Sequence, residues 1–111
     1  MAVRMTKPWQ PLTADNVARL TGHLGVYELA DENGEIVLIG FAGGRSSHGL
    51  KGELQAHLQT PPANATRFRV EVTMAYRTRH LELLQAHVHD HDRLPSANRE
   101  ARESLGRLRP A

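Results

Sequence analysis

Two β-rich runs on either side of an Asn-Gly pair constrain the fold of this chain more than any other feature. The first run is Val26-Tyr27-Glu28-Leu29-Ala30, and the second is Glu35-Ile36-Val37-Leu38-Ile39-Gly40, with Asn33-Gly34 between them. An Asn-Gly pair favours the tight turn that joins two antiparallel strands. The sequence therefore predicts a β-hairpin that begins at Gly25 and ends at Gly40.

The elements around this hairpin follow from apolar spacing and from residues that start or stop helices. Thr13 is a good N-cap for a short helix over residues 14–20. A glycine-rich loop over residues 41–49 precedes a helix, and Leu50, Leu54 and Leu58 mark the buried stripe of that helix. Two prolines then end the helix.

The second half of the chain alternates between strand and helix periodicity. Residues 66–76 alternate apolar with polar side chains, which predicts a half-buried strand with a charged outer face. Helical spacing returns over about residues 78–92, and Ser96 can cap a last helix that runs to about Leu108. The predicted order is helix, strand, strand, helix, strand, helix, helix. This order predicts an α+β fold in which helices cover a small three-stranded sheet, as a single domain over residues 1–111.

The composition excludes several kinds of chemistry. The chain has no cysteine, so disulfides, thiolate metal sites and thiol nucleophiles are excluded, and a reducing cytoplasm is the expected location. The longest apolar stretches, such as residues 36–39, are far too short to span a bilayer. The start of the sequence also lacks the apolar core of a signal peptide. We therefore expect a cytoplasmic domain with no membrane partner.

The charge is small overall but unevenly distributed. The net charge is +2, and twelve of the fourteen basic residues are arginine. The first 50 residues carry four basic and five acidic side chains, whereas the rest carry ten basic and seven acidic ones. The planar guanidinium of arginine suits phosphate, so nucleic acid is permitted as a partner. An ordinary solvated surface explains the same arginines equally well.

Four short motifs, together with the element order, resemble the GIY-YIG nuclease family. Gly25-Val26-Tyr27 stands where the first triplet of that family opens a strand, and Leu38-Ile39-Gly40 stands where the second triplet closes the next strand. The run Leu50-Lys51-Gly52-Glu53-Leu54-Gln55-Ala56-His57 is similar to the family's first core helix, and Pro95-Ser96-Ala97-Asn98 matches its Pro-x-x-Asn. The resemblance covers about residues 25–98 and implies a GIY-YIG-like core with a helical extension at each end.

The resemblance implies metal-dependent cleavage of phosphodiesters in DNA or RNA. Such cleavage needs an activated water, a cation that neutralises the developing charge, and a basic group on the phosphate. By resemblance, Tyr27 assists in activating the water and Lys51 stabilises charge on the phosphate. Glu82 would hold one divalent ion, Mg²⁺ or Mn²⁺. Arg45 or His57 would supply a further phosphate contact.

Three positions depart from the family pattern. Leu38 replaces the second tyrosine, and Lys51 stands in place of the usual arginine, which keeps the charge but loses the bidentate geometry. The family's interval before the proline reaches Ala86 instead of a glutamate, whereas Glu82 lies one helical turn earlier on the same face. The chain is thus either a divergent nuclease or an inactive GIY-YIG-like module that binds nucleic acid or a protein partner.

Two further features leave their own alternatives open. The glycine-rich loop with Arg45 can present amides and a guanidinium to phosphate, although it lacks the spacing of a P-loop. The run His87-Val88-His89-Asp90-His91-Asp92 places two histidines at i and i+4, which can share a metal on a helix. A metal-binding protein that uses these three histidines is therefore a third hypothesis. A solvated helix end is the simpler interpretation of the same run.

Overall fold

The computed structural model describes residues 4–99, and a four-stranded antiparallel sheet forms its middle layer. The strand order is β1-β4-β2-β3. The strands are β1 (Gln10–Pro11), β2 (Gly25–Ala30), β3 (Ile36–Ala42) and β4 (Arg67–Val72). The helices are α1 (Ala14–Ala18), α2 (Gly49–Gln59) and α3 (Tyr76–His91), and a 3₁₀ turn spans Pro62–Asn64.

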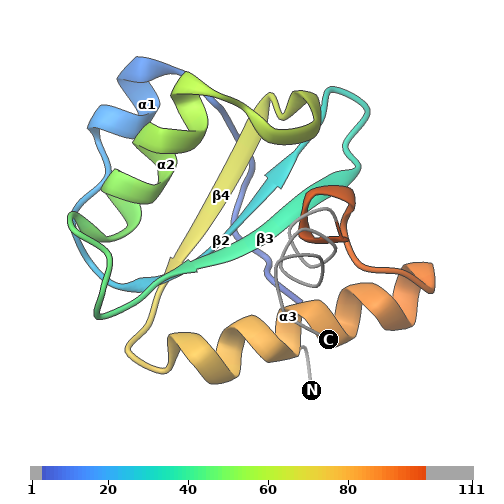
Figure 1. The fold of residues 1–111 in the computed structure, drawn as a ribbon. Helices are drawn as coiled ribbons and strands as arrows, with labels where there is room; N and C mark the ends of the chain where they lie inside the picture. The colour runs from blue at the N-terminus through green and yellow to red at the C-terminus, as the bar shows by residue number, and fades with distance from the viewer. Residues whose placement is uncertain (1–3, 100–111) are drawn as a thin grey trace, which may run out of the picture.

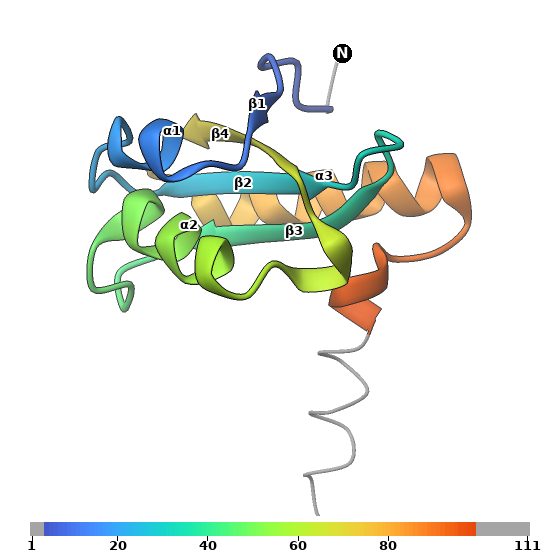
Figure 2. The same cartoon turned by 90° about the horizontal axis from the view of Figure 1, so that it is seen from above.

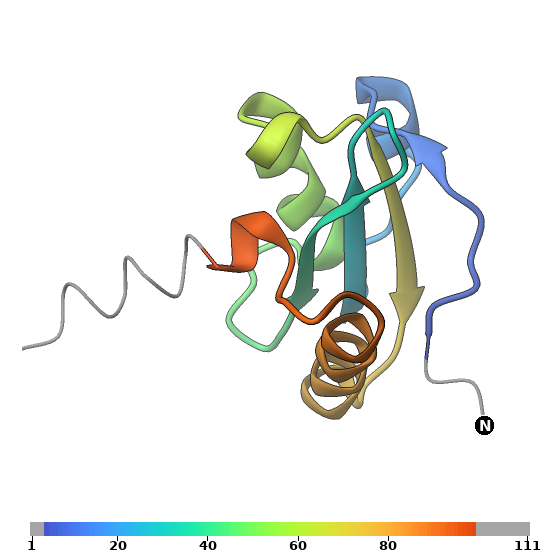
Figure 3. The same ribbon diagram turned by 90° about the vertical axis from the view of Figure 1, so that its right-hand side faces the viewer.

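Helices cover both faces of this sheet. Figure 1 shows α1 and α2 on one face and α3 across the other, and the end-on view of α3 in Figure 3 shows the same three layers. Strand β2 lies in the interior of the sheet, so all six of its residues are buried. Figure 2 shows β1 beside β4, at the edge of the sheet opposite to β3.

Each face of the sheet has its own apolar cluster. On the side of α1 and α2, Leu29 and Phe68 from the sheet pack with Val17 and Leu54 from the helices. On the side of α3, Val26 and Ile39 pack with Leu83, and Met5 from the N-terminal segment joins them. Because strand side chains alternate between the two faces, neighbouring residues of β2 contribute to different clusters.

The predicted hairpin is confirmed. Gly34 adopts a φ of 83°, the left-handed conformation that glycine takes without strain. The Asp31 carboxylate accepts the backbone N–H groups of Asn33 and Glu35, each at 3.0 Å, and so fixes the turn locally. Strands β2 and β3 then pair from Gly25↔Ala42 to Ala30↔Ile36.

The sheet differs from the prediction in its strand number. It has four strands instead of three, because the two-residue β1 pairs with Phe68 and Arg67 of β4. Pro11 is tolerated there because β1 is an edge strand, where a missing N–H costs no ladder bond. Strand β4 also ends earlier than predicted, at Val72, because its partner β2 begins at Gly25 opposite that residue.

The charged face of β4 was predicted to be an outer face of the sheet, and this prediction was wrong. Helix α3 packs over that side of the sheet, and the charged side chains form ion pairs beneath or beside it. Arg69 pairs with Glu28, and Glu71 pairs with Arg79 of α3. The alternation was therefore correct, but Arg69 and Glu71 are only partly exposed because of these ion pairs.

The last described residues form the start of the helix predicted at Ser96. Residues 96–99 are helical, and the remainder of that predicted helix, to Leu108, lies outside the described residues. Asn98 contacts β3, which is an edge strand: its Oδ1 accepts the Ile39 N–H at 2.8 Å, and its Nδ2 donates to the Ile39 carbonyl at 3.0 Å. The side chain thus satisfies an unpaired backbone position of the strand. Within residues 4–99, no helix has the length and apolar character needed to cross a membrane.

Candidate functional site

Tyr27 lies near the middle of β2 and points toward α1 and α2. Its side chain is buried, and Gly40 of β3 is directly opposite in the strand register. A Cβ atom on Gly40 would lie 2.4 Å from the Tyr27 Cζ and Oη atoms, which is closer than real contacts allow. Glycine at position 40 therefore makes room for the tyrosine ring, and the two motifs of the hairpin form one structural unit.

The Tyr27 hydroxyl belongs to a polar group that we call the tyrosine cluster, made of Tyr27, His57, Glu53 and Ser46. The hydroxyl lies 2.8 Å from His57 Nε2 and donates to Glu53 Oε1 at 3.3 Å. Ser46 Oγ donates to the other Glu53 oxygen at 3.5 Å. Three segments therefore meet here, namely β2, the loop after β3 and helix α2.

Burial governs the protonation of this cluster. Burial, reinforced by the charge and the hydrogen bond of Glu53, raises the pKa of the Tyr27 hydroxyl above its ordinary value. Burial also lowers the pKa of His57, against the opposing charge of Glu53. Tyr27 and His57 are therefore held in their neutral forms at neutral pH. Because the hydroxyl has one proton, it accepts from His57 Nε2 while it donates to Glu53.

The predicted phosphate contacts lie near this cluster along the chain. His57 is part of it, and Arg45 is exposed in the loop that carries Ser46. Lys51 lies in the first turn of α2 and is half-buried. Leu38, at the position of the second tyrosine, packs against the same apolar cluster as Tyr27 and serves the core.

Glu82 does not lie with Tyr27. It belongs to α3, which covers the face of the sheet opposite to the tyrosine cluster, as Figure 1 shows. Its Oε1 is 3.8 Å from an Arg79 nitrogen, and it remains partly exposed. Ala86, one turn further along, is buried. The structure thus brings together Tyr27 and His57, and it separates both from the candidate metal ligand by the thickness of the sheet.

The three histidines near the end of α3 do not all lie on the same side of the helix. His87 is buried, and its ring centroid is 4.4 Å from that of His91, while His89 lies on another flank of the helix with Glu82 and Gln85. Among residues 4–99, no group of three or more histidine or carboxylate side chains is arranged to hold a metal ion. The geometry therefore offers neither Glu82 nor the histidine run a complete ligand set.

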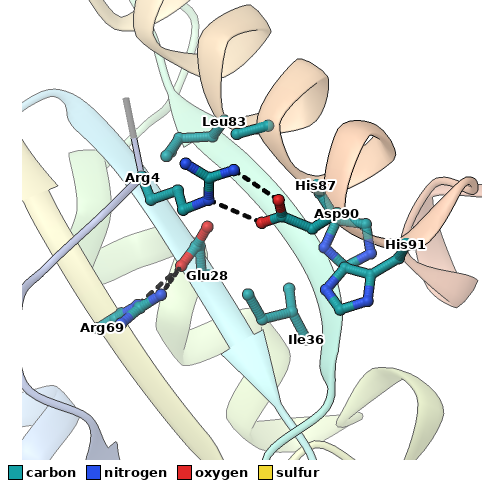
Figure 4. Close-up of a pocket in the computed structure, with 9 residues that line it drawn as sticks. Arg4, Glu28, Ile36, Arg69, Leu83, His87, Asp90 and His91 are labelled. Carbon is teal, nitrogen blue, oxygen red and sulfur yellow. Dashed lines mark hydrogen bonds and ion pairs between the residues drawn. The ribbon is translucent and has the colours of Figure 1, made fainter. Parts of the chain in front are cut away.

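Two arginine-lined hollows remain to be compared with the tyrosine cluster. The first, shown in Figure 4, lies between the sheet, α3 and the N-terminal segment and has a volume of about 70 Å³. We call it the ion-paired cavity. Its charged lining residues are Arg4, Glu28, Arg69 and Asp90, with His87 and His91 beside them.

Both arginines of the ion-paired cavity are neutralised. Arg4 Nε donates to Asp90 at 2.7 Å, and Arg69 Nε donates to Glu28 at 2.7 Å. Figure 4 shows these two pairs side by side. Burial raises the pKa of Glu28, although the charge of Arg69 pulls it back. The Arg69 guanidinium also lies 4.1 Å from the centroid of the Trp9 ring, so the N-terminal segment closes over the pair.

The second hollow lies where the C-terminal end of β3 meets the start of α3. We call it the arginine cleft, and it has a volume of about 430 Å³. Its lining consists of two aromatic residues, two arginines and three residues of the loop: Phe41, Tyr76, Arg45, Arg77, Gly43, Gly44 and Ser46. Ser46 also belongs to the tyrosine cluster, so the two sites share one loop.

The arginine cleft carries unneutralised positive charge. Within residues 4–99, neither Arg45 nor Arg77 forms an ion pair, and both are exposed. None of the described residues that line the cleft is acidic. An anion would therefore find two guanidinium groups without a carboxylate partner there, which are well suited to phosphate oxygens.

The comparison with known proteins gives a family without a stated activity. Residues 3–90 match a domain family described as "Domain of unknown function (DUF7508)". The chain belongs to this family. No curated protein matches the chain. No solved structure matches it either. Because the family description names no activity, the function has to be argued from the site.

Several residues of the site were not singled out from the sequence. Glu53 lies within the helix motif that the resemblance identified, but its contact with Tyr27 depends on the packing of α2 against β2. Phe41, Tyr76 and Arg77 come from segments more than thirty positions apart in the sequence. The local signal in the sequence for this end of the hairpin was the glycine-rich loop with Arg45.

Proposed function

We propose that this chain binds nucleic acid by holding phosphodiester groups at the arginine cleft. The carrying observation is the pair of exposed, unneutralised guanidinium groups of Arg45 and Arg77 around a cleft without acidic lining. The positive balance of the second half of the sequence supports the same partner.

We also propose that the hairpin, helix, strand and helix form a GIY-YIG-like scaffold. The motifs that carry this resemblance meet in space, which supports the proposal. Tyr27 and Gly40 face each other across two strands, and Asn98 holds the backbone of Ile39, next to Gly40. The structure is that of an α+β domain with an antiparallel sheet. The likeness of this domain to the GIY-YIG scaffold is the proposal.

Salt-dependent binding tests the proposal. Each phosphate that is neutralised releases counterions, so log K for a short labelled duplex should fall linearly with log salt between about 50 and 200 mM. Arg45→Gln and Arg77→Gln should each reduce the slope by roughly 0.9. Arg67→Gln is the matched control, because Arg67 is also exposed but lies at the opposite end of the sheet.

The result that would overturn the proposal is equally specific. If wild-type protein binds neither duplex nor single strands at low salt, the chain does not act on nucleic acid. If Arg67→Gln changes the slope as much as Arg45→Gln does, the contact is diffuse and the cleft is not the site. Fluorescence anisotropy over a salt series separates these outcomes.

Metal-dependent cleavage of DNA or RNA is the second candidate, and the contact between the Tyr27 hydroxyl and His57 Nε2 favours it. A divalent ion such as Mg²⁺ or Mn²⁺ would supply charge stabilisation. Glu82, its proposed ligand, pairs with Arg79 on the other face of the sheet, so these residues do not fit one shared metal site with Tyr27. We therefore derive no reaction step through the ion.

Plasmid cleavage separates the enzyme from the inactive module. If the wild type cleaves with Mg²⁺ or Mn²⁺, Tyr27→Phe should slow cleavage by about 10²–10⁴-fold, the usual contribution of a positioned proton-transfer group. Glu82→Gln keeps the shape of the side chain and removes its charge. Loss of cleavage in that variant would restore Glu82 as the metal ligand. Absence of cleavage by the wild type with both metals and both nucleic acids would leave the binding module.

A further inference from the structure

The arginine cleft contains two stacked aromatic rings, Phe41 and Tyr76, beside its two arginines. We call this pair of rings the aromatic step. The rings of Phe41 and Tyr76 are nearly parallel, with an interplanar angle of 20° and centroids 5.6 Å apart. The edge of His80 meets Phe41 from another side, with centroids 5.0 Å apart. Phe41 keeps 38% of its surface exposed, so part of its ring is available to a ligand.

The step is held in place by the glycine-rich loop. The Gly44 N–H donates to the Tyr76 hydroxyl at 3.1 Å, and the Gly43 N–H donates to Ser46 Oγ at 3.0 Å. A Cβ atom on Gly43 would lie 2.7 Å from Tyr76 Cε1, so only glycine allows the ring to approach the loop this closely. The aromatic surface is therefore prepared before any ligand arrives.

The two arginines of the cleft lie beside the aromatic rings. The Arg77 guanidinium lies 6.0 Å from the Tyr76 centroid, at the outer limit of a cation–π contact. The hydrogen bond from Gly44, and after it the hydrogen bond and the charge of Arg77, lower the pKa of the Tyr76 hydroxyl. Arg45 belongs to the same loop whose Gly44 N–H donates to the Tyr76 hydroxyl. A cleft with aromatic faces and flanking guanidinium groups combines the two elements that recognise unpaired nucleotides, namely a stacking surface and phosphate contacts.

We infer that the arginine cleft binds an unpaired nucleotide of a single strand, with its base on the Phe41–Tyr76 step and its neighbouring phosphates on Arg45 and Arg77. This inference rests on the proposed function, because it specifies which form of nucleic acid the cleft takes. A base within a duplex is already stacked and paired, so it cannot lie on this step. The chain should therefore prefer single strands, with little dependence on sequence.

The experiment compares a short thymidine strand, an abasic strand of equal length and a duplex by anisotropy. Phe41→Leu keeps an apolar side chain but removes the aromatic face. It should weaken binding of the thymidine strand by about 5- to 100-fold, the usual effect of losing one base–aromatic stack. It should leave binding of the abasic strand and of the duplex unchanged. Leu81→Ala, at an exposed apolar residue of α3 outside the cleft, is the control and should change none of the three.

The outcomes distinguish this inference from the proposed function. If Phe41→Leu weakens all three ligands equally, or none, the stacking inference is overturned while phosphate binding stands. If wild-type protein binds the abasic strand as tightly as the thymidine strand, stacking is likewise excluded. If no ligand binds at low salt, the proposed function itself fails. A thermal melt of each variant, matched to the wild type, ensures that a loss of binding is not a loss of fold.

Discussion

The two arginine-lined hollows of this domain use the same side chain for opposite purposes. In the ion-paired cavity, Arg4 and Arg69 each meet a carboxylate at 2.7 Å, and the volume of the hollow is about 70 Å³. In the arginine cleft, Arg45 and Arg77 form no ion pair with any of residues 4–99, and the volume is about 430 Å³. The ion pairs of the first hollow connect parts of the fold to one another. The arginines of the second hollow remain available to bind an anion.

The difference shows that the number of arginines does not reveal where a chain binds anions. Arg69 lies opposite Glu28 in the β2–β4 register, so its charge is used within the sheet. Arg45 and Arg77 flank a loop and a helix start, and neither forms an ion pair with a described carboxylate. The sequence places Arg69 and Arg77 in the basic half and Arg45 in the other half. Only the fold shows that Arg69 is paired while Arg45 and Arg77 lie together at one cleft.

The largest effect should come from breaking the buried pair. Arg69→Met leaves the Glu28 carboxylate buried without its partner, and such a change typically costs about 3–5 kcal/mol of unfolding free energy. Arg77→Met, at an exposed and unpaired arginine, should stay within roughly 0.5 kcal/mol. Urea unfolding measures both variants.

Two controls sharpen this prediction. The double variant Arg69→Met with Glu28→Leu removes the uncompensated charge, so it should regain much of the loss. The deficit of Arg69→Met alone should shrink as the pH falls, because the pKa of Glu28 is already raised by burial and protonation relieves the charge. Equal losses in Arg69→Met and Arg77→Met would erase the distinction between the two hollows.

The elements that could be predicted from the sequence are those with local signals. The hairpin turn lies where Asn33-Gly34 predicts it, but only Gly34 of the pair has a positive φ, and the turn closes by a hydrogen bond from the Gly34 N–H to the Asp31 carbonyl. Leu50 and Leu54, the first two residues of the predicted helix stripe, are both fully buried. Helix α3 begins two residues before its predicted start and ends one residue before its predicted end.

The elements that could not be predicted depend on distant partners. Strand β1 has only two residues, one of them Pro11, and it exists because β4 offers a free edge. The carboxylate of Glu28 within a strand of apolar residues was a visible anomaly, but its partner Arg69 lies 41 positions away. Sequence periodicity cannot show which strands are neighbours.

The candidate site also has residues that could be predicted from the sequence and residues that could not. The resemblance named Tyr27 and His57, and these two side chains are in contact. It also named Glu82, whose place on α3 follows from the packing of that helix on the other face of the sheet. The arginine cleft was anticipated only through Arg45 and the glycine-rich loop, because Tyr76 and Arg77 reach it by way of β4.

A pair of glycine variants tests whether the arginine cleft is built as tightly as the ion-paired cavity. Gly43→Ala places a Cβ atom 2.7 Å from Tyr76 Cε1, so the ring must shift from Phe41. We expect a loss of about 1 kcal/mol of stability, at the low end for overpacking because Tyr76 is partly exposed. Gly44→Ala is the matched control, since its nearest atom would be 3.7 Å away, an ordinary contact.

Binding should respond to these variants more strongly than stability does. Gly43→Ala displaces the aromatic step and should weaken single-strand binding, whereas Gly44→Ala should retain it. If both variants bind alike, the position of Tyr76 does not matter for the ligand. Anisotropy with the thymidine strand, alongside thermal melts, gives both quantities for each protein.

The smallest expected effect is a pH dependence that belongs to the ion-paired cavity and not to the cleft. Burial and then the charge of His91 lower the pKa of His87 below its model-compound value of 6.5, and Arg93 adds to this, while Asp90 and Glu35 oppose it. Because the folded pKa lies below the unfolded one, the unfolded chain binds more protons in this window. Stability is therefore complete above about pH 6.5 and is lost as the pH falls toward the folded pKa of His87.

Replacing His87 should flatten that dependence. His87→Gln removes the titrating group, so the difference between urea midpoints at about pH 8 and about pH 5.5 should shrink relative to the wild type. It should not vanish, because burial also lowers the pKa of His57 in the tyrosine cluster. His89→Gln is the matched control for replacing a histidine of α3 by glutamine, since His89 is exposed on the same helix and does not line the ion-paired cavity. An identical slope in wild type and His87→Gln would mean that the buried imidazole costs nothing to protonate, and that the ion-paired cavity admits solvent as freely as the cleft does.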